Sequence, residues 1–176
     1  MTKDEWIEIF SKPVNKIRVN ELALYGSQND IAIKDLMSIT LHDTPEIAFR
    51  AAWVLENSVL CYEKNYSINE LVGYYLKQNN FSCMRHYTKI MMFLVKRGKI
   101  LMTKDSDKVI DLTFEWLINP TTPVAVKVNC LDILYGFKDY SDWIVEELPS
   151  QIQFHLKDGT AAMQSRGKKL LKHLRC

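Results

Sequence analysis

The sequence predicts an all-α protein of about ten helices of ordinary length, and three observations support this prediction. Helix-start signals recur along the whole chain of 176 residues. Glycine and proline are scarce, with 6 and 5 residues, so the chain has few of the turns that β-hairpins need. The only short run that could be extended is KILMT, residues 99–103, and one isolated strand cannot form a sheet.

Each expected helix begins at a residue that suits a helix N-terminus. Serine, threonine, aspartate and asparagine accept hydrogen bonds from the free N–H groups of the first turn, and proline fits that turn because it has no N–H group. Pro149 lies inside the ninth expected helix and should stop or bend it. In chain order, the expected starts are Thr2 with Glu5, Pro13, Ser27 or Asp30, Thr44 with Pro45, Ser67 with Glu70, Ser82, Asp105 or Ser106, residues 121–123, Ser141 and Ala161.

Internal repetition groups these helices into pairs. Three segments of the first half have counterparts in the second half: IRVNELALYG (17–26) and VKVNCLDILYG (126–136), DEWIEIF (4–10) and SDWIVEEL (141–148), and TPEIAFRAAWVLE (44–56) and TTPVAVKVNCLDIL (121–134). Helix pairs that repeat in sequence bury their apolar faces by stacking on one another. The sequence therefore predicts a single domain, residues 1–176, whose helix pairs span about residues 2–26, 28–60, 67–98, 105–137 and 141–175.

The second helix of each expected pair carries a basic residue within its first two turns. Four of these residues follow an aspartate or asparagine of the preceding turn by five to eight positions, and only Arg18 does not. The five basic residues are Arg18, Arg50, Arg85, Lys127 and Arg166. We expect the basic side chains to bind the turns and connect adjacent pairs, although a row of positive charge displayed to a partner is the alternative. The expected structural ladder consists of Asp43, Arg50, Asn80, Asn119, Lys127, Asp158 and Arg166.

The best-defined pair, DLMSITLHDTPEIAFRAAWVLE at residues 35–56, resembles HEAT repeats, the two-helix units of α-solenoids. It has a first helix, a turn of the Asp-x-Pro type, an arginine and a pair of small residues. One difference is that Arg50 adjoins Ala51, whereas the arginine of the family stands several residues before the small pair. The resemblance implies an α-α superhelix of the HEAT or armadillo type, with about five antiparallel helix pairs.

Composition and motifs favour a soluble cytoplasmic protein without a cofactor. The net charge is only +2, the N-terminus has no signal-peptide pattern, and no run of eighteen apolar residues spans a membrane. Four scattered cysteines suggest reduced thiols. Cys83 and His86 have the spacing of a metal-ligand pair, but no second pair lies nearby, so we expect no metal.

The predicted function is a non-catalytic scaffold that binds a protein or peptide on the curved surface of a short α-solenoid. The alternative is nucleic-acid binding in a basic groove, as in HEAT-like bacterial proteins that scan DNA for damage, although the balanced charge disfavours it. The candidate binding residues are Arg85, Lys89 and Lys96, which spacings of three and four place near one stripe of a helix, and Tyr87 on the same helix. Further basic residues cluster at Arg97, Lys99, Lys104 and Lys108, and again between Arg166 and Arg175.

Overall fold

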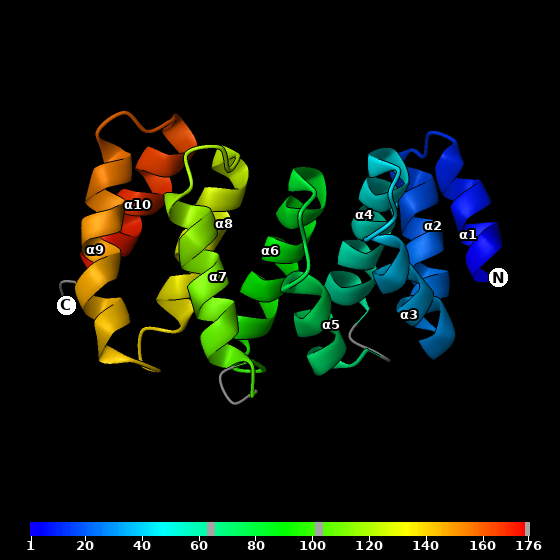
Figure 1. Ribbon diagram of the computed structural model, residues 1–176, viewed down its shortest axis with the longest axis horizontal. Helices are drawn as coiled ribbons and strands as arrows, with labels where there is room; N and C mark the ends of the chain where they lie inside the picture. The colour runs from blue at the N-terminus through cyan, green and yellow to red at the C-terminus, as the bar shows by residue number, and fades with distance from the viewer. Residues whose placement is uncertain (63–65, 101–103, 175–176) are drawn as a thin grey trace. The chain divides into compact units, whose positions relative to one another are not determined.

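The computed structural model describes residues 1–62, 66–100 and 104–174, and within them the protein contains ten α-helices and no β-strand (Figure 1). The all-α prediction is confirmed for this part of the chain. Residues 101–103 of the candidate strand, and residue 175 of the last expected helix, lie outside the described residues. The helices are α1 (Lys3–Ser11), α2 (Lys16–Ser27), α3 (Asp30–Ile39), α4 (Pro45–Cys61), α5 (Ile68–Tyr75), α6 (Phe81–Lys96), α7 (Ser106–Ile118), α8 (Val124–Gly136), α9 (Asp142–Leu156) and α10 (Ala161–Leu174).

The chain divides into two compact units, Met1–Ile90 and Met91–Cys176, and α6 crosses the boundary between them. In both units the helices pack as pairs of the α-solenoid type. Within pairs, α3 packs on α4, α7 on α8 and α9 on α10. Between neighbouring pairs, second helices contact second helices, as α2 contacts α4 and α8 contacts α10.

The core of the first unit is built around α4, the longest of its helices. Ala48, Ala51, Ala52, Leu55 and Val59 are all buried, as the apolar face of this segment predicts. The small side chains allow close packing, and α4 contacts α1, α2 and α3.

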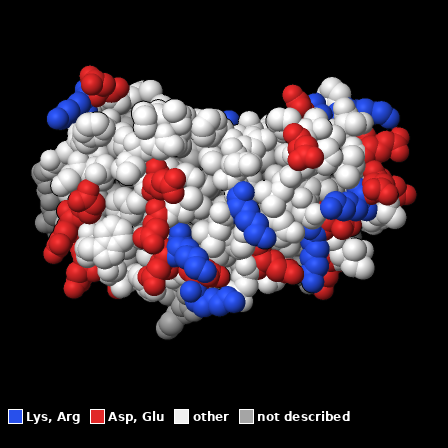
Figure 2. Space-filling model, in the orientation of Figure 1, with Lys and Arg blue, Asp and Glu red and all other residues white. Residues whose placement is uncertain are grey.

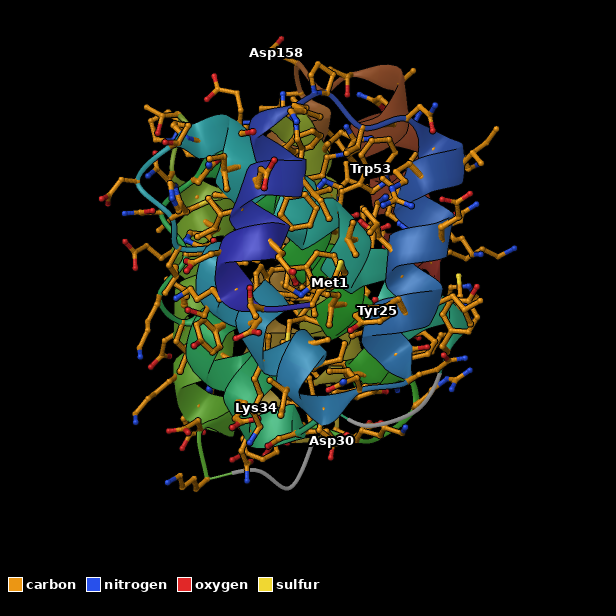
Figure 3. The ribbon with its side chains drawn as sticks, turned by 90° about the vertical axis from the view of Figure 1, so that its right-hand side faces the viewer. Met1, Tyr25, Asp30, Lys34, Trp53 and Asp158 are labelled. Carbon is orange, nitrogen blue, oxygen red and sulfur yellow. The ribbon has the colours of Figure 1, made fainter. Side chains whose placement is uncertain are left out.

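The N-terminus is fixed to the first unit by a contact with α2. The amino group of Met1 donates a hydrogen bond of 2.5 Å to the Tyr25 hydroxyl, and the two residues lie side by side in Figure 3. Trp6 and Phe10 on α1 are fully buried and stack with their ring centroids 5.4 Å apart. α1 therefore closes one end of the core of this unit rather than extending into solvent.

The core of the second unit is built around α8, which contacts α7, α9 and α10. Cys130, Leu131 and Leu134 are fully buried on this helix. α10 approaches α9 closely at Gly167, where an added Cβ would lie 3.0 Å from the Cγ2 of Ile152. A glycine at this position therefore permits the short distance between the two helices.

The structure confirms several helix starts and corrects two expectations. Thr2 and Glu5 form the predicted capping box of α1. α2 begins at Lys16, after an Asn15 side chain that accepts a hydrogen bond from the Arg18 N–H, so Pro13 precedes the helix instead of lying in its first turn. Pro149 lies inside α9, which continues to Leu156, so this proline does not stop the helix.

We expect Leu55→Ala and Leu131→Ala each to lower the free energy of unfolding by about 2–5 kcal/mol, because each empties a fully buried site between packed helices. Urea denaturation followed by circular dichroism measures the change. Leu24→Ala on α2 is the control, because Leu24 is exposed and its truncation should cost less than about 1 kcal/mol. Equal losses at all three positions would contradict this description of the two cores.

Candidate functional site

The four residues predicted to bind a partner all lie on α6, but their side chains have different environments. Arg85 and Lys96 are exposed. Tyr87 is fully buried, and its hydroxyl lies 3.0 Å from the Oγ1 of Thr40. Tyr87, a candidate binding residue, therefore points into the core, because residues two apart on a helix point to nearly opposite sides. Arg85 and Lys89 belong to the first unit and Lys96 to the second.

Lys89 is part of a buried cluster that joins α6 to α4. Its Nζ donates a hydrogen bond of 3.0 Å to the Oε1 of Glu56. The other carboxylate oxygen of Glu56 lies 2.5 Å from the Nδ1 of His86. Glu56 and His86 are buried, whereas Lys89 is half-exposed. The stripe is thus anchored to the core at Lys89, which sequence spacing alone did not indicate.

The electrostatics of this cluster are those of a structural ion pair. Burial raises the pKa of the Glu56 carboxyl, but the hydrogen bonds and charges of His86 and Lys89 outweigh it and hold the pKa below its usual value. The ring of Phe49 covers His86, with the two ring centroids 5.3 Å apart. The cluster connects the second helices of two successive pairs.

In the first unit, the expected ladder residues bind backbone carbonyls instead of turn carboxylates. The Nη1 of Arg50 donates a hydrogen bond of 2.6 Å to the carbonyl of Phe10, at the end of α1. No ion pair joins Arg50 to Asp43 in the part of the chain that the structure describes, so the expected Asp43–Arg50 contact is wrong. Asn80 donates to the Pro45 carbonyl at 3.4 Å and thereby links the starts of α4 and α6.

The ladder residues of the second unit are arranged differently. Asn119 binds its own turn, because its Oδ1 accepts hydrogen bonds from the N–H and the hydroxyl of Thr121 at 3.0 and 2.8 Å. Arg166 lies beside Asp132 rather than Asp158, with 3.2 Å between the Arg166 Nε and the Asp132 Oδ2. Lys127 is only 9% exposed, and within the described residues it has no hydrogen bond or ion pair.

A cavity of the second unit with a volume of about 640 Å³ lies where α8 and α10 meet the end of α6. Four basic side chains and one histidine line it, together with a single carboxylate from Asp132. We call this cavity the basic groove, and its charged and ionisable residues are Lys96, Asp132, Lys138, Arg166, Lys169 and His173. Met92, Val95, Tyr135 and Leu170 provide an apolar lining.

Helical periodicity explains how these residues come together. Arg166, Lys169, Leu170 and His173 have relative positions of zero, three, four and seven, so they form one face of α10. The end of α8 also approaches α6 closely. The absence of a side chain at Gly136 permits this approach, since an added Cβ would lie 2.2 Å from the Cγ1 of Val95. The sequence indicated the basic cluster of α10, but not the side chains of α8 that it would face.

Asp132 is surrounded by the basic side chains of the groove. Burial raises the pKa of its carboxyl, and the charges of Arg166, Lys169 and Lys96 lower it by less, so that the pKa stays above its usual value. Lys138 lies 3.3 Å from the exposed carboxylate of Asp139. With Asp132 the only acid in its lining, the groove presents an excess of positive charge to solvent.

Comparison with known proteins gives no relative: the sequence matches no protein-family model and no curated protein. No group of three or more histidine, cysteine, aspartate or glutamate side chains is placed to hold a metal ion in the described residues. Among the described helices, none is long and apolar enough to cross a membrane.

We expect Arg50→Ala to lower the free energy of unfolding by about 1–3 kcal/mol, because it leaves the Phe10 carbonyl without its charged donor. Asp43→Ala should change stability by less than about 0.5 kcal/mol, since the exposed Asp43 does not bind Arg50. Chemical denaturation of both variants and of the double variant measures these values. A loss at Asp43 as large as that at Arg50, with strong coupling between them, would contradict the contact described here.

Glu56→Gln should lower stability at neutral pH by about 1–3 kcal/mol, because Gln cannot pair with both His86 and Lys89. Since folding lowers the pKa of Glu56, the wild-type contribution is present above the pKa of the unfolded state, near 4.3, and is lost as pH falls through the folded pKa. The difference between wild type and variant should therefore shrink below about pH 4. Urea midpoints measured from pH 3 to 7 test this, with Glu21→Gln, which removes an exposed ion pair with Arg18, as the control.

Proposed function

We propose that the protein is a non-catalytic scaffold of HEAT-like helix pairs and that it binds an acidic segment of a partner protein in the basic groove. The observation that carries this proposal is the composition of the groove: four basic side chains and an apolar lining around one carboxylate. A surface of this kind attracts negative charge over several ångströms and offers contacts to apolar side chains between the acids.

The dimensions of the groove also suit a short peptide. Its volume of about 640 Å³ falls within the range of about 300–1,000 Å³ that is typical of binding pockets. Lys96 is exposed, and Arg166 is held near the carboxylate of Asp132. An arginine fixed in this way offers part of its planar donor group to an incoming carboxylate with little loss of side-chain entropy.

Nucleic acid is the competing ligand, because phosphates would meet the same positive charges. Two observations favour a peptide. The apolar lining of the groove can contact apolar side chains of a peptide, which a phosphate backbone does not have. The net charge of the chain is only +2, which gives little long-range attraction for nucleic acid, and acidic and basic residues are interspersed on the face drawn in Figure 2.

The test uses a fluorescein-labelled peptide of alternating glutamate and leucine, twelve residues long, and fluorescence anisotropy. We expect Lys96→Glu with Lys169→Glu to weaken peptide binding by about tenfold or more, because two attractive contacts become repulsive. Lys168→Glu with Lys172→Glu is the matched control. It reverses the same number of charges on exposed residues of α10 that do not line the groove, so it should alter the affinity by less than about twofold.

Labelled single- and double-stranded DNA of twenty nucleotides are the competing probes. Tighter binding of either DNA than of the peptide, lost in the same double variant, would replace the peptide with nucleic acid as the ligand. An unchanged peptide affinity in a folded Lys96→Glu, Lys169→Glu protein would remove the basic groove as the binding site. Circular dichroism of each variant establishes that the fold is intact.

A further inference from the structure

A second cavity of the second unit, with a volume of about 260 Å³, lies at the starts of α8 and α10. The turn before α8 and the turn before α10 are at the same end of this unit, the upper end in Figure 1, and α8 and α10 pack against each other. Thr122 and Val124 line the cavity from the start of α8, and Thr160 lines it from the start of α10. Two helix N-termini, each with a partial positive charge, therefore border one small space.

The N-terminus of α8 retains free donors. Its N-cap residue is Pro123, and no side chain caps the helix. The first N–H groups of a helix have no carbonyl partner within that helix, so those at the start of α8 are available to a ligand in the cavity. At α10 the Thr160 hydroxyl accepts a hydrogen bond of 3.5 Å from the Met163 N–H, so this start is only weakly capped.

Lys127 on α8 provides an independent sign that a ligand belongs in the cavity. Its side chain lines the cavity, is about nine-tenths buried, and has no hydrogen bond or ion pair within the residues that the structure describes. The side chain is largely enclosed, its Nζ has no acceptor within the described part of the chain, and the partial desolvation of the ammonium favours an anion supplied from outside the chain. The neighbouring His155 also lines the cavity, and its Nε2 is buried without a hydrogen-bond partner in the same described part.

Burial disfavours the charged form of both side chains. Burial lowers the pKa of the Lys127 ammonium. Burial also lowers the pKa of His155, the positive charge of Lys127 lowers it further, and a hydrogen bond with the backbone of Leu117 opposes these effects. Two of the other charged groups that line the cavity, Lys157 and Asp158, are exposed, and Asp158 stands at the outer edge of the fold in Figure 3. Neither forms an ion pair with Lys127 in the described residues.

We infer that this cavity is a binding site for a compact oxyanion of the phosphate class, either free phosphate or the phosphate of a small phosphomonoester. The Lys127 ammonium and the free N–H groups at the start of α8 are the donors, and the His155 ring beside them adds positive charge when it is protonated. A divalent anion fits better than a carboxylate because a lysine and two helix N-termini together offer roughly two positive charges. Since the share of one water in the liquid is about 30 Å³, the cavity accommodates a phosphate with several waters. The site is separate from the basic groove and does not depend on the proposed peptide binding.

The experiment measures binding of inorganic phosphate by isothermal titration calorimetry and by NMR, at constant ionic strength maintained with sodium chloride. The protein carries Lys96→Glu and Lys169→Glu, so that the basic groove does not compete for the anion. We expect phosphate to bind and to shift the titration of His155 to higher pH, because a nearby anion stabilises the imidazolium. Sulfate, whose charge does not change in this pH range, should produce the same shift. His155→Gln assigns the NMR signal among the 4 histidines.

Lys127→Met is the decisive variant, since methionine fits an apolar environment and removes the charge. It should weaken phosphate binding by about tenfold or more while leaving the protein folded, with a melting temperature equal to or above that of the parent. Lys157→Met at the exposed rim is the matched control and should weaken binding by less than about threefold. Asp158→Asn should strengthen binding, because it removes the one carboxylate that lines the cavity.

Serine O-phosphate and serine distinguish the two sources of the phosphate group. Binding of inorganic phosphate with exclusion of the phosphomonoester identifies a free anion, and binding of both identifies a site open to a phosphorylated ligand. Acetate that binds as tightly as phosphate would overturn the assignment to the phosphate class. An unchanged phosphate affinity in folded Lys127→Met, or no phosphate-dependent shift of His155, would overturn the site itself.

Discussion

The need to bury a second helix on several sides determines the arrangement of this protein. α4 and α8 have apolar side chains around most of their circumference, and each contacts at least three other helices of its own unit. A helix of this kind cannot satisfy its surface within one helix pair, so successive pairs must stack. The close approaches at Gly136 and Gly167 are local consequences, because helices with bulkier residues there would stand further apart.

Stacking also determines where charged groups meet. In an array of helix pairs, second helices run side by side in the same direction, so their N-termini collect at one end and equivalent residues line neighbouring faces. α8 and α10 are such a pair in the second unit. Their starts border the cavity that contains Lys127, and their later turns provide Asp132 and Arg166 to the basic groove. Two separate cavities, both lined by basic side chains, therefore arise along one helix–helix contact.

The sequence predicted the elements of the fold well and the side-chain partners poorly. Capping signals and apolar periodicity are local, which is why the ten helices and the buried position of Leu55 followed from them. Glu56 and His86 are 30 residues apart and meet only through packing of α4 on α6, so no local pattern indicates them. Arg50 was expected to bind a carboxylate, but burial of its side chain near the end of α1 favours the Phe10 carbonyl as the acceptor. Tyr87 lies on the same helix as the basic residues but points into the core, and the sequence alone does not show which face of the helix is exposed.

The basic residue at the equivalent position of the second helix has a different environment in each unit. In the first unit Arg50 gives its hydrogen bond to a backbone carbonyl, and the buried charge of Glu56 is matched by Lys89 and His86. In the second unit the corresponding Lys127 faces a cavity, and Asp132 is surrounded by more positive charge than it can neutralise. A charge that is paired within the chain contributes to stability. A desolvated charge that is left unpaired lowers stability until a ligand of opposite charge binds to it. Binding of an anion should therefore release more free energy at the uncompensated positive charge of the second unit than at the balanced clusters of the first unit.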